Sequence, residues 1–134
     1  MVDDPSLIPN AIEEVLRYDS PAQHSARSVA RDVEWHGQTV PGGSVMLVLK
    51  GSANRDERVF ENPERFDITR DAPHLSLGYG IHYCLGAALA RLEGRVALDE
   101  VLQRFPEWEV DTDGAHLAST STVRGWEALP VTVP

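Results

Sequence analysis

One cysteine stands in a glycine-rich segment directly before a long stretch of apolar residues at helical spacing. Cys84 is the only cysteine of the 134 residues, and its segment reads Gly78-Tyr-Gly-Ile-His-Tyr-Cys-Leu-Gly86. At the start of a helix, unpaired N–H groups and the positive dipole end stabilise a thiolate. Gly78, Gly80 and Gly86 remove side chains, so a flat, bulky group can approach the backbone closely. An exposed thiolate with free space around it is what an axial ligand of heme iron requires.

Other interpretations of this segment fit the residues less well. A dinucleotide-binding motif needs a third glycine at the position of Tyr83, after a buried strand that the preceding residues do not predict. A P-loop needs Lys followed by Ser or Thr, which the segment lacks. The remaining alternative is an inert cysteine that packs as a small hydrophobic residue. The surrounding glycines and the helix start favour the ligand role.

Two helices are predicted on either side of this loop. Residues 5–19 predict a mostly buried helix opened by Pro9 and Asn10, with apolar residues on one face. Residues 86–105 predict the longest helix, with a stripe of leucine and valine that ends before a proline. The ligand loop, residues 77–86, leads directly into this second helix.

The other segments predict short strands and an ordered connection. Even spacing of apolar residues predicts strands within 25–50, with a turn at His36-Gly37. Residues 51–76 contain few apolar anchors and many Arg and Asp residues, which predicts an ordered meander held by ion pairs. Residues 108–134 predict a β-hairpin tail. Together these elements predict one α+β domain over 1–134, a length typical of single domains.

Composition and charge exclude several classes of protein. The chain has 12 Lys plus Arg against 21 Asp plus Glu and a formal net charge of -9, so we expect no nucleic-acid partner. One cysteine excludes an internal disulfide and a multi-cysteine metal site. No apolar run approaches the ~20 residues of a membrane helix, and the acidic first residues differ from a signal peptide. We therefore expect a soluble, cytoplasmic protein with no membrane partner.

Four elements, in order, resemble the cytochrome P-450 family of heme-thiolate monooxygenases in its soluble bacterial form. They are Glu14-Val-Leu-Arg17 for the E-x-x-R pair, Ala53-Asn-Arg-Asp56, Pro63-Glu-Arg-Phe66 for the PERF element, and the loop from Leu77 to Gly86. The loop matches F-x-x-G-x-(H or R)-x-C-x-G except that Leu77 replaces the Phe. The resemblance runs over 5–134 and implies the C-terminal third of the fold: E-x-x-R helix, mixed strands, meander, Cys loop with long helix, and hairpin tail.

The resemblance also implies a cofactor and roles for individual residues. It implies heme b (iron protoporphyrin IX), with Cys84 as the iron ligand and with His82 and Arg27 on the heme propionates. Leu77 and the glycines Gly78, Gly80 and Gly86 would form the loop around the cofactor.

A second implied group of residues is structural. Glu14 and Arg17 would form an internal ion pair, joined by Arg65, that locks the meander behind the heme.

Two departures from the family limit what this chain can do alone. The family's oxygen-activating helix, with a small-Gly-x-acid-Thr motif before the E-x-x-R helix, has no counterpart in these residues. We therefore expect no distal wall and no proton relay in this chain. The family has a Phe at Leu77 that packs against the thiolate, so the leucine implies altered redox tuning rather than loss of heme. Residues 22–25 and 119–124 match substrate-facing segments and would border a pocket without enclosing it.

The function implied by the resemblance is dioxygen-dependent hydroxylation of a small organic substrate, with electrons from a ferredoxin- or flavodoxin-type donor. The alternative is a non-catalytic heme-binding or sensor module, or a truncated remnant that needs a partner chain. Apolar residues on the predicted helices, among them Ala11, Val15, Leu89 and Val96, would lose part of their cover. A large exposed apolar patch usually finds a partner, so we expect self-association or a complementary chain.

Overall fold

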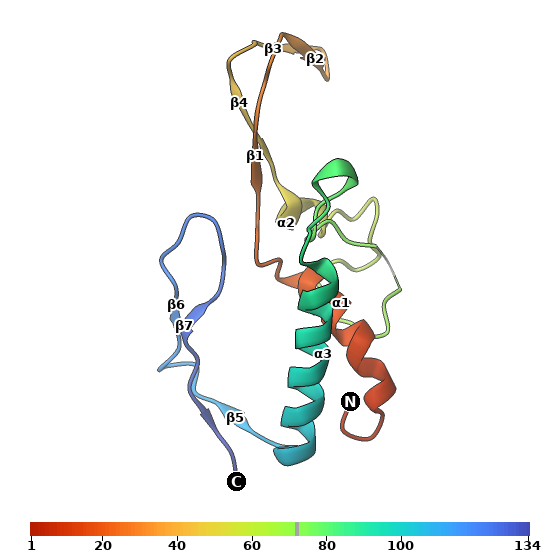
Figure 1. Cartoon of the computed structure of the whole chain (residues 1–134), viewed down its shortest axis with the longest axis vertical. Coiled ribbons are helices and arrows are strands. Elements are labelled where there is room, and N and C mark those ends of the chain that lie inside the picture. The colour runs from red at the N-terminus through yellow and green to blue at the C-terminus, as the bar shows by residue number, and fades with distance from the viewer. Residues whose placement is uncertain (72) are drawn as a thin grey trace.

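Two long helices lie side by side, and the described residues also form four two-stranded β ladders (Figure 1). The computed structural model describes residues 1–71 and 73–134, so Ala72 of the predicted meander lies outside the described residues. The elements are a 3₁₀ turn Pro5–Leu7, α1 Ile8–Tyr18, β1 Ser25–Ser28, β2 Val33–Trp35, β3 Gln38–Val40, β4 Val45–Val48, α2 Lys50–Ala53, a 3₁₀ turn Gly80–His82, α3 Ala87–Arg104, β5 Glu109–Val110, β6 His116–Leu117, β7 Trp126–Ala128 and β8 Val131–Thr132. This mixture of helices and short strands is the predicted α+β class.

The first helix does not begin as the sequence suggested. Helix α1 begins at Ile8, after a 3₁₀ turn capped by the Asp4 carboxylate, which accepts the Ser6 N–H at 3.1 Å. Asn10 caps nothing. Its side-chain amide instead donates to the carbonyl oxygens of Ile68 and Arg70, the latter at 3.1 Å. Asn10 therefore attaches the meander to α1, because a backbone with few regular hydrogen bonds needs side-chain donors for its carbonyls.

The strands form nested antiparallel pairs. β1 pairs with β4, with Arg27 opposite Met46. β2 pairs with β3 at the end of this extension that is farther from the helices (Figure 1). The turn predicted at His36-Gly37 is present, with φ of 51° and 76°. Two consecutive positive φ values match the twist of a two-residue hairpin, and glycine adopts the second without strain. In the tail, β6 pairs with β7 and β5 pairs with β8.

Helices α1 and α3 pack against each other at a glycine (Figure 1). A Cβ added at Gly94 of α3 would lie 3.4 Å from Cδ1 of Ile12 on α1, so the small residue allows this close approach. The contact places the start of α3, and with it the Cys84 loop, beside α1. The rest of the site therefore depends on how α1 is held.

The buried residues are as often polar as apolar. The buried apolar side chains are Ile8, Ala11, Val29, Phe60 and Ala87, and the buried polar residues are Glu14, Arg17, Ser20, Asn54 and Ser76. Ala11 is only 1% exposed, so it keeps the cover that we expected it to lose, whereas Val15 is 49% exposed, as we expected for a residue that loses part of its cover. The interior is thus organised around charged and amide groups.

Many large apolar side chains lie on the surface. The stripe of α3 is open, with Leu89 57% and Val96 50% exposed, as we expected. The accessible surface is 9945 Å², whereas a compact monomer of this mass exposes about 7,000 Å². None of the helices in the described residues has both the length and the apolar composition to cross a membrane.

We expect the isolated chain to self-associate, because the α3 stripe is exposed and the chain leaves more surface in water than a compact monomer of its mass. Sedimentation equilibrium over a series of concentrations should give an average mass that rises above 14.8 kDa. Replacing Leu89 and Val96 by serine should lower that mass. A mass of 14.8 kDa at all concentrations for the unmodified chain would contradict this expectation.

Candidate functional site

The Cys84 loop folds back on itself through backbone hydrogen bonds. The Cys84 N–H donates to the Leu77 carbonyl oxygen at 2.7 Å, and the Tyr83 N–H donates to that of Gly80 at 3.0 Å. Gly78 has φ of +80°, and a Cβ added there would lie 2.9 Å from the His82 carbonyl oxygen. The loop can close this tightly only with glycine at that position.

Helix α3 begins directly behind the cysteine. The Ala87 N–H donates to the Cys84 carbonyl oxygen at 3.2 Å, and Gly86 is the N-cap residue. A Cβ added at Gly86 would lie 3.9 Å from the Cys84 sulfur, so the glycine keeps this side of the sulfur open. Cys84 is an exposed free cysteine rather than a buried, inert one.

Cys84 lines a cavity of about 340 Å³ between the loop and the β1–β4 ladder, called here the Cys84 cavity. Five of the predicted cofactor residues line it: Arg27, Leu77, Gly78, His82 and Cys84. Gly80 and Gly86 do not line it; Gly80, like Gly78, has a positive φ, and Gly86 is the N-cap residue of α3. The structure thus gathers cationic and imidazole groups, an apolar side chain and one thiol around a single space.

Sequence reasoning missed a cationic residue of this cavity. Lys50, the only lysine of the chain, lines the cavity together with Arg27. Arg27 donates to the Ala26 carbonyl oxygen at 2.8 Å, and within the described residues neither side chain forms an ion pair. The signal that could have found Lys50 is its position two residues after the end of β4, the strand that pairs with the one carrying Arg27.

The Glu14–Arg17 pair is buried and completely hydrogen-bonded. Arg17 Nε and Nη2 donate to the two Glu14 oxygens at 2.7 and 2.8 Å. The other three bonds go to carbonyl oxygens of the meander: Asn54 and Pro63 at 2.9 Å each and Arg65 at 3.2 Å. These five bonds use all five N–H donors of the guanidinium. Both side chains are 1% exposed, so the pair lies inside the protein rather than on a helix surface.

The predicted role of the Arg65 side chain is wrong. Arg65 contributes its main-chain carbonyl, whereas its guanidinium is 71% exposed and lies 3.8 Å from Asp67. Arg70 takes the second cationic position, with Nε 3.4 Å from Glu14 and a side chain that is 13% exposed. Spacing along an irregular segment does not indicate which arginine turns inward, because no helical or strand period fixes the directions of its side chains.

Several charges together keep the Glu14 carboxylate ionised. Burial raises the pKa of Glu14, but the hydrogen bonds from Arg17 and from the Asp67 N–H, with the Arg17 and Arg70 charges, lower it to below its usual value. The Asp67 N–H bond is 2.8 Å long and extends the cluster into the meander. The charged Glu14 carboxylate accepts hydrogen bonds from side chains and from the main chain of the meander. It therefore holds the meander to α1, although the two segments share no secondary structure.

Asn54 connects this cluster to the start of the Cys84 loop. Its side-chain oxygen accepts the Leu75 N–H at 2.7 Å, and its amide nitrogen donates to Ser76 Oγ at 2.7 Å. Ser76 Oγ in turn donates to the Leu16 carbonyl oxygen at 2.5 Å. The residues directly before Leu77 are therefore fixed to α1 by buried polar groups.

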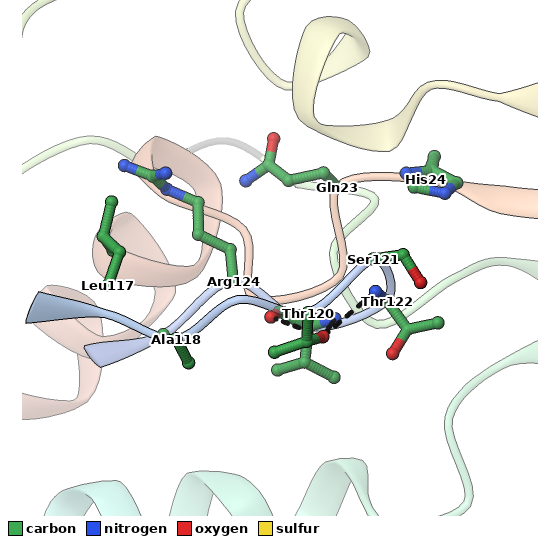
Figure 2. A pocket seen from close by; sticks show the side chains of 10 residues that line it. Gln23, His24, Leu117, Ala118, Thr120, Ser121, Thr122 and Arg124 are labelled. Carbon is green, nitrogen blue, oxygen red and sulfur yellow. Dashed lines mark hydrogen bonds between the residues drawn. The ribbon is translucent and has the colours of Figure 1, made fainter. Parts of the chain in front are cut away.

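A second cavity, of about 290 Å³, lies between residues 23–24 and the tail turn, and is called here the tail cavity. Figure 2 shows Gln23 and His24 on one side and Thr120, Ser121 and Thr122 on the other. Arg124 joins the two sides, since its Nε lies 2.7 Å from Asp19 and its N–H donates to the Pro21 carbonyl oxygen at 2.6 Å. The two segments expected to border a pocket do so.

Comparison with known proteins identifies the family. The model of the family "Cytochrome P450", here written cytochrome P-450, matches residues 2–126. The chain belongs to the cytochrome P-450 family. It is 47% identical over 131 residues to the 6-deoxyerythronolide B hydroxylase of Saccharopolyspora erythraea, a match that covers 96% of this chain and 32% of that protein.

Solved structures of P-450 proteins match the fold closely. The hydroxylase HmtN of himastatin biosynthesis has a TM-score of 0.94 at 44% identity, over 99% of this chain and 36% of that one. The P-450 BioI, solved with an acyl carrier protein ligated to hexadec-9Z-enoic acid, has a TM-score of 0.93 at 44% identity, over 99% of this chain and 35% of that one. The chain spans about a third of the length of these relatives.

The cofactor of the P-450 family is heme b, and the Cys84 cavity fits this group. The Cys84 sulfur is exposed and free on the side of Gly86, and a soft sulfur ligand suits heme iron. The cationic side chains of Arg27 and Lys50 suit a group with two carboxylates, and Leu77 suits its apolar ring.

The substitution Arg17→Leu should strongly destabilise the folded chain, because it removes the main partner of the buried Glu14 carboxylate. Removal of one partner from a buried pair costs about 3–5 kcal/mol, a large part of the roughly 5–15 kcal/mol available to a small domain. The free energy of unfolding in urea, or the soluble yield where the variant fails to fold, measures the loss. Arg58→Leu is the control, since Arg58 pairs with Asp56 while 85% exposed and should leave the midpoint unchanged. Equal midpoints for the two variants would contradict the role of the buried pair.

Proposed function

We propose that this chain provides the heme-thiolate site of a monooxygenase that hydroxylates a small organic substrate. The observation that carries the proposal is the position of Cys84, exposed at the start of α3 on the edge of a cavity that also contains Arg27 and His82. The similarity to proteins named as hydroxylases supports the reaction class.

Each residue of the cavity has a proposed task. Cys84 binds the iron through its sulfur, and Arg27 and His82 bind the two propionates, with Lys50 adding a cation near them. Leu77 lies at the position beside the sulfur and limits the access of water to it. Bound heme with a thiolate ligand supplies the activation of dioxygen, because the thiolate donates electron density to the iron and favours O–O cleavage.

The glycines of the loop have a different task. Gly78 and Gly80 adopt φ of +80° and +61°, and a Cβ would lie 2.9 Å from the His82 carbonyl oxygen at Gly78 but would meet no atom at Gly80. Gly86 leaves the sulfur open to a flat group, because it adds no Cβ next to it. We propose that these three positions fix the shape of the loop and bind no part of the heme by side chain.

The tail cavity is the proposed place of one part of the substrate. Its lining combines hydroxyl groups from Thr120, Ser121 and Thr122 with the apolar side chains of Leu117 and Val123. Such a lining suits a small organic molecule that carries a few polar groups. The proposed electron donor is a ferredoxin- or flavodoxin-type protein.

Substitutions of Cys84 test the proposal in the reduced, carbon-monoxide-treated protein with heme added. The unmodified chain should show the red-shifted Soret band of a thiolate ligand. Cys84→Ala should lose that band, and Cys84→His should give a histidine-type spectrum with heme retained.

The control is Arg27→Leu, which removes a propionate contact but leaves the sulfur in place. It should weaken heme binding and keep the thiolate-type band. If Cys84→Ala kept the red-shifted band, another group would be the ligand, and the proposed function would be wrong.

A further inference from the structure

Glu13 on α1 connects two paths of hydrogen bonds that end on the two sides of the Cys84 loop. Its Oε1 accepts from Arg91 Nε at 2.6 Å, and its Oε2 accepts from Arg91 Nη2 at 2.8 Å. Oε2 also lies 3.1 Å from His74 Nε2. The Arg91 hydrogen bonds lower the pKa of Glu13 despite its partial burial, so the carboxylate is charged at neutral pH.

The first path reaches the residue next to the cysteine. Arg91 lies on α3, and its remaining terminal nitrogen, Nη1, donates to Tyr83 Oη at 2.8 Å. A bidentate pair fixes the plane of the guanidinium, and the third nitrogen then points in a defined direction. Tyr83 is thus tied to α1 through one arginine.

The second path reaches the residues before the loop. His74 has a side chain only 3% exposed, and burial lowers its pKa in spite of the Glu13 charge beside it, so the imidazole is neutral. Its Nδ1 accepts the Ser76 N–H at 3.2 Å, which places the ring proton on Nε2, where it is donated to Glu13. Ser76 is therefore held to the same carboxylate as Tyr83.

The loop between these anchors has little to fix it. Gly78 and Gly80 both have positive φ, and glycine loses more conformational freedom on ordering than any other residue. The bond from the Ala87 N–H to the Cys84 carbonyl oxygen fixes the end of the loop to α3, but within the described residues no main-chain hydrogen bond joins residues 77–84 to α1. The position of the sulfur relative to α1 thus depends on side-chain contacts from outside the loop.

We propose that Glu13 is a positioning residue for the Cys84 thiolate, acting through Arg91 and Tyr83 on one side and through His74 and Ser76 on the other. Its direct partners, Arg91 and His74, differ from those of the Glu14–Arg17 cluster, although both groups reach Ser76. The inference rests on the proposed function only for the identity of the group that Cys84 binds.

Amide hydrogen exchange of the heme-free chain tests the two paths separately, because local opening limits exchange. Glu13→Gln keeps the shape and removes the charge, and it should speed exchange of the Ser76 and Cys84 amides by about tenfold, the effect of one lost charge-assisted hydrogen bond. Tyr83→Phe should speed exchange at Cys84 alone. Glu100→Gln breaks the exposed Glu100–Arg104 pair of α3 and should change neither amide.

The Asp67 amide, bound by Glu14, is the reference. If Glu13→Gln speeds exchange at Asp67 as much as at Cys84, Glu13 is a general structural residue and the proposal fails. It also fails if Tyr83→Phe leaves Cys84 unchanged.

A spectroscopic measurement follows in the heme-loaded protein. Tyr83→Phe and Glu13→Gln should each shift the Soret band, whereas Glu100→Gln should not; an unshifted band in both would overturn the positioning role. If the unmodified chain bound no heme, the proposed function would fail, while the exchange data would still decide whether Glu13 holds the loop.

Discussion

The Glu14–Arg17 ion pair is the interaction on which the remaining structure depends. The guanidinium binds three meander carbonyl oxygens besides its carboxylate partner, and the carboxylate binds the Asp67 N–H and Arg70. Within the described residues no ladder or helix connects the meander to α1, so these polar bonds, with the edge-to-face contact of Phe66 on Tyr18, hold the two segments together. A charge held this way must keep all its partners, because each lost bond leaves a buried polar group unpaired.

The interior contains as many buried polar as buried apolar residues, while many large apolar residues lie on the surface. Hydrogen bonds of Asn54 and Ser76 connect the cluster to the start of the Cys84 loop. Glu13 connects α1 to the end of that loop through Arg91. The apolar stripe of α3 stays exposed. The chain spans about a third of its relatives' length, and the buried apolar residues among those described are only Ile8, Ala11, Val29, Phe60 and Ala87.

Local patterns in the sequence predicted the local features well. The His36-Gly37 turn and the glycine-flanked cysteine before α3 follow from backbone preferences of neighbouring residues. Contacts between residues that are distant in the sequence could not be predicted from such local patterns. Asn10 had the type of a cap but binds the meander, and Arg65 had the expected charge but points into solvent, because side-chain direction in irregular segments is set by tertiary packing. The two partners of Glu13, Arg91 and His74, likewise lie in separate segments, which no single spacing relates.

The side-chain NMR signals of Arg17 test most directly whether this cluster organises the chain. With five hydrogen bonds in a buried site, rotation of the guanidinium and exchange of its protons with water should both be slow. We therefore expect separate, slowly exchanging Nη–H signals for Arg17 in the heme-free chain, unlike those of exposed Arg58. A single averaged signal that exchanges as fast as that of Arg58 would contradict the account.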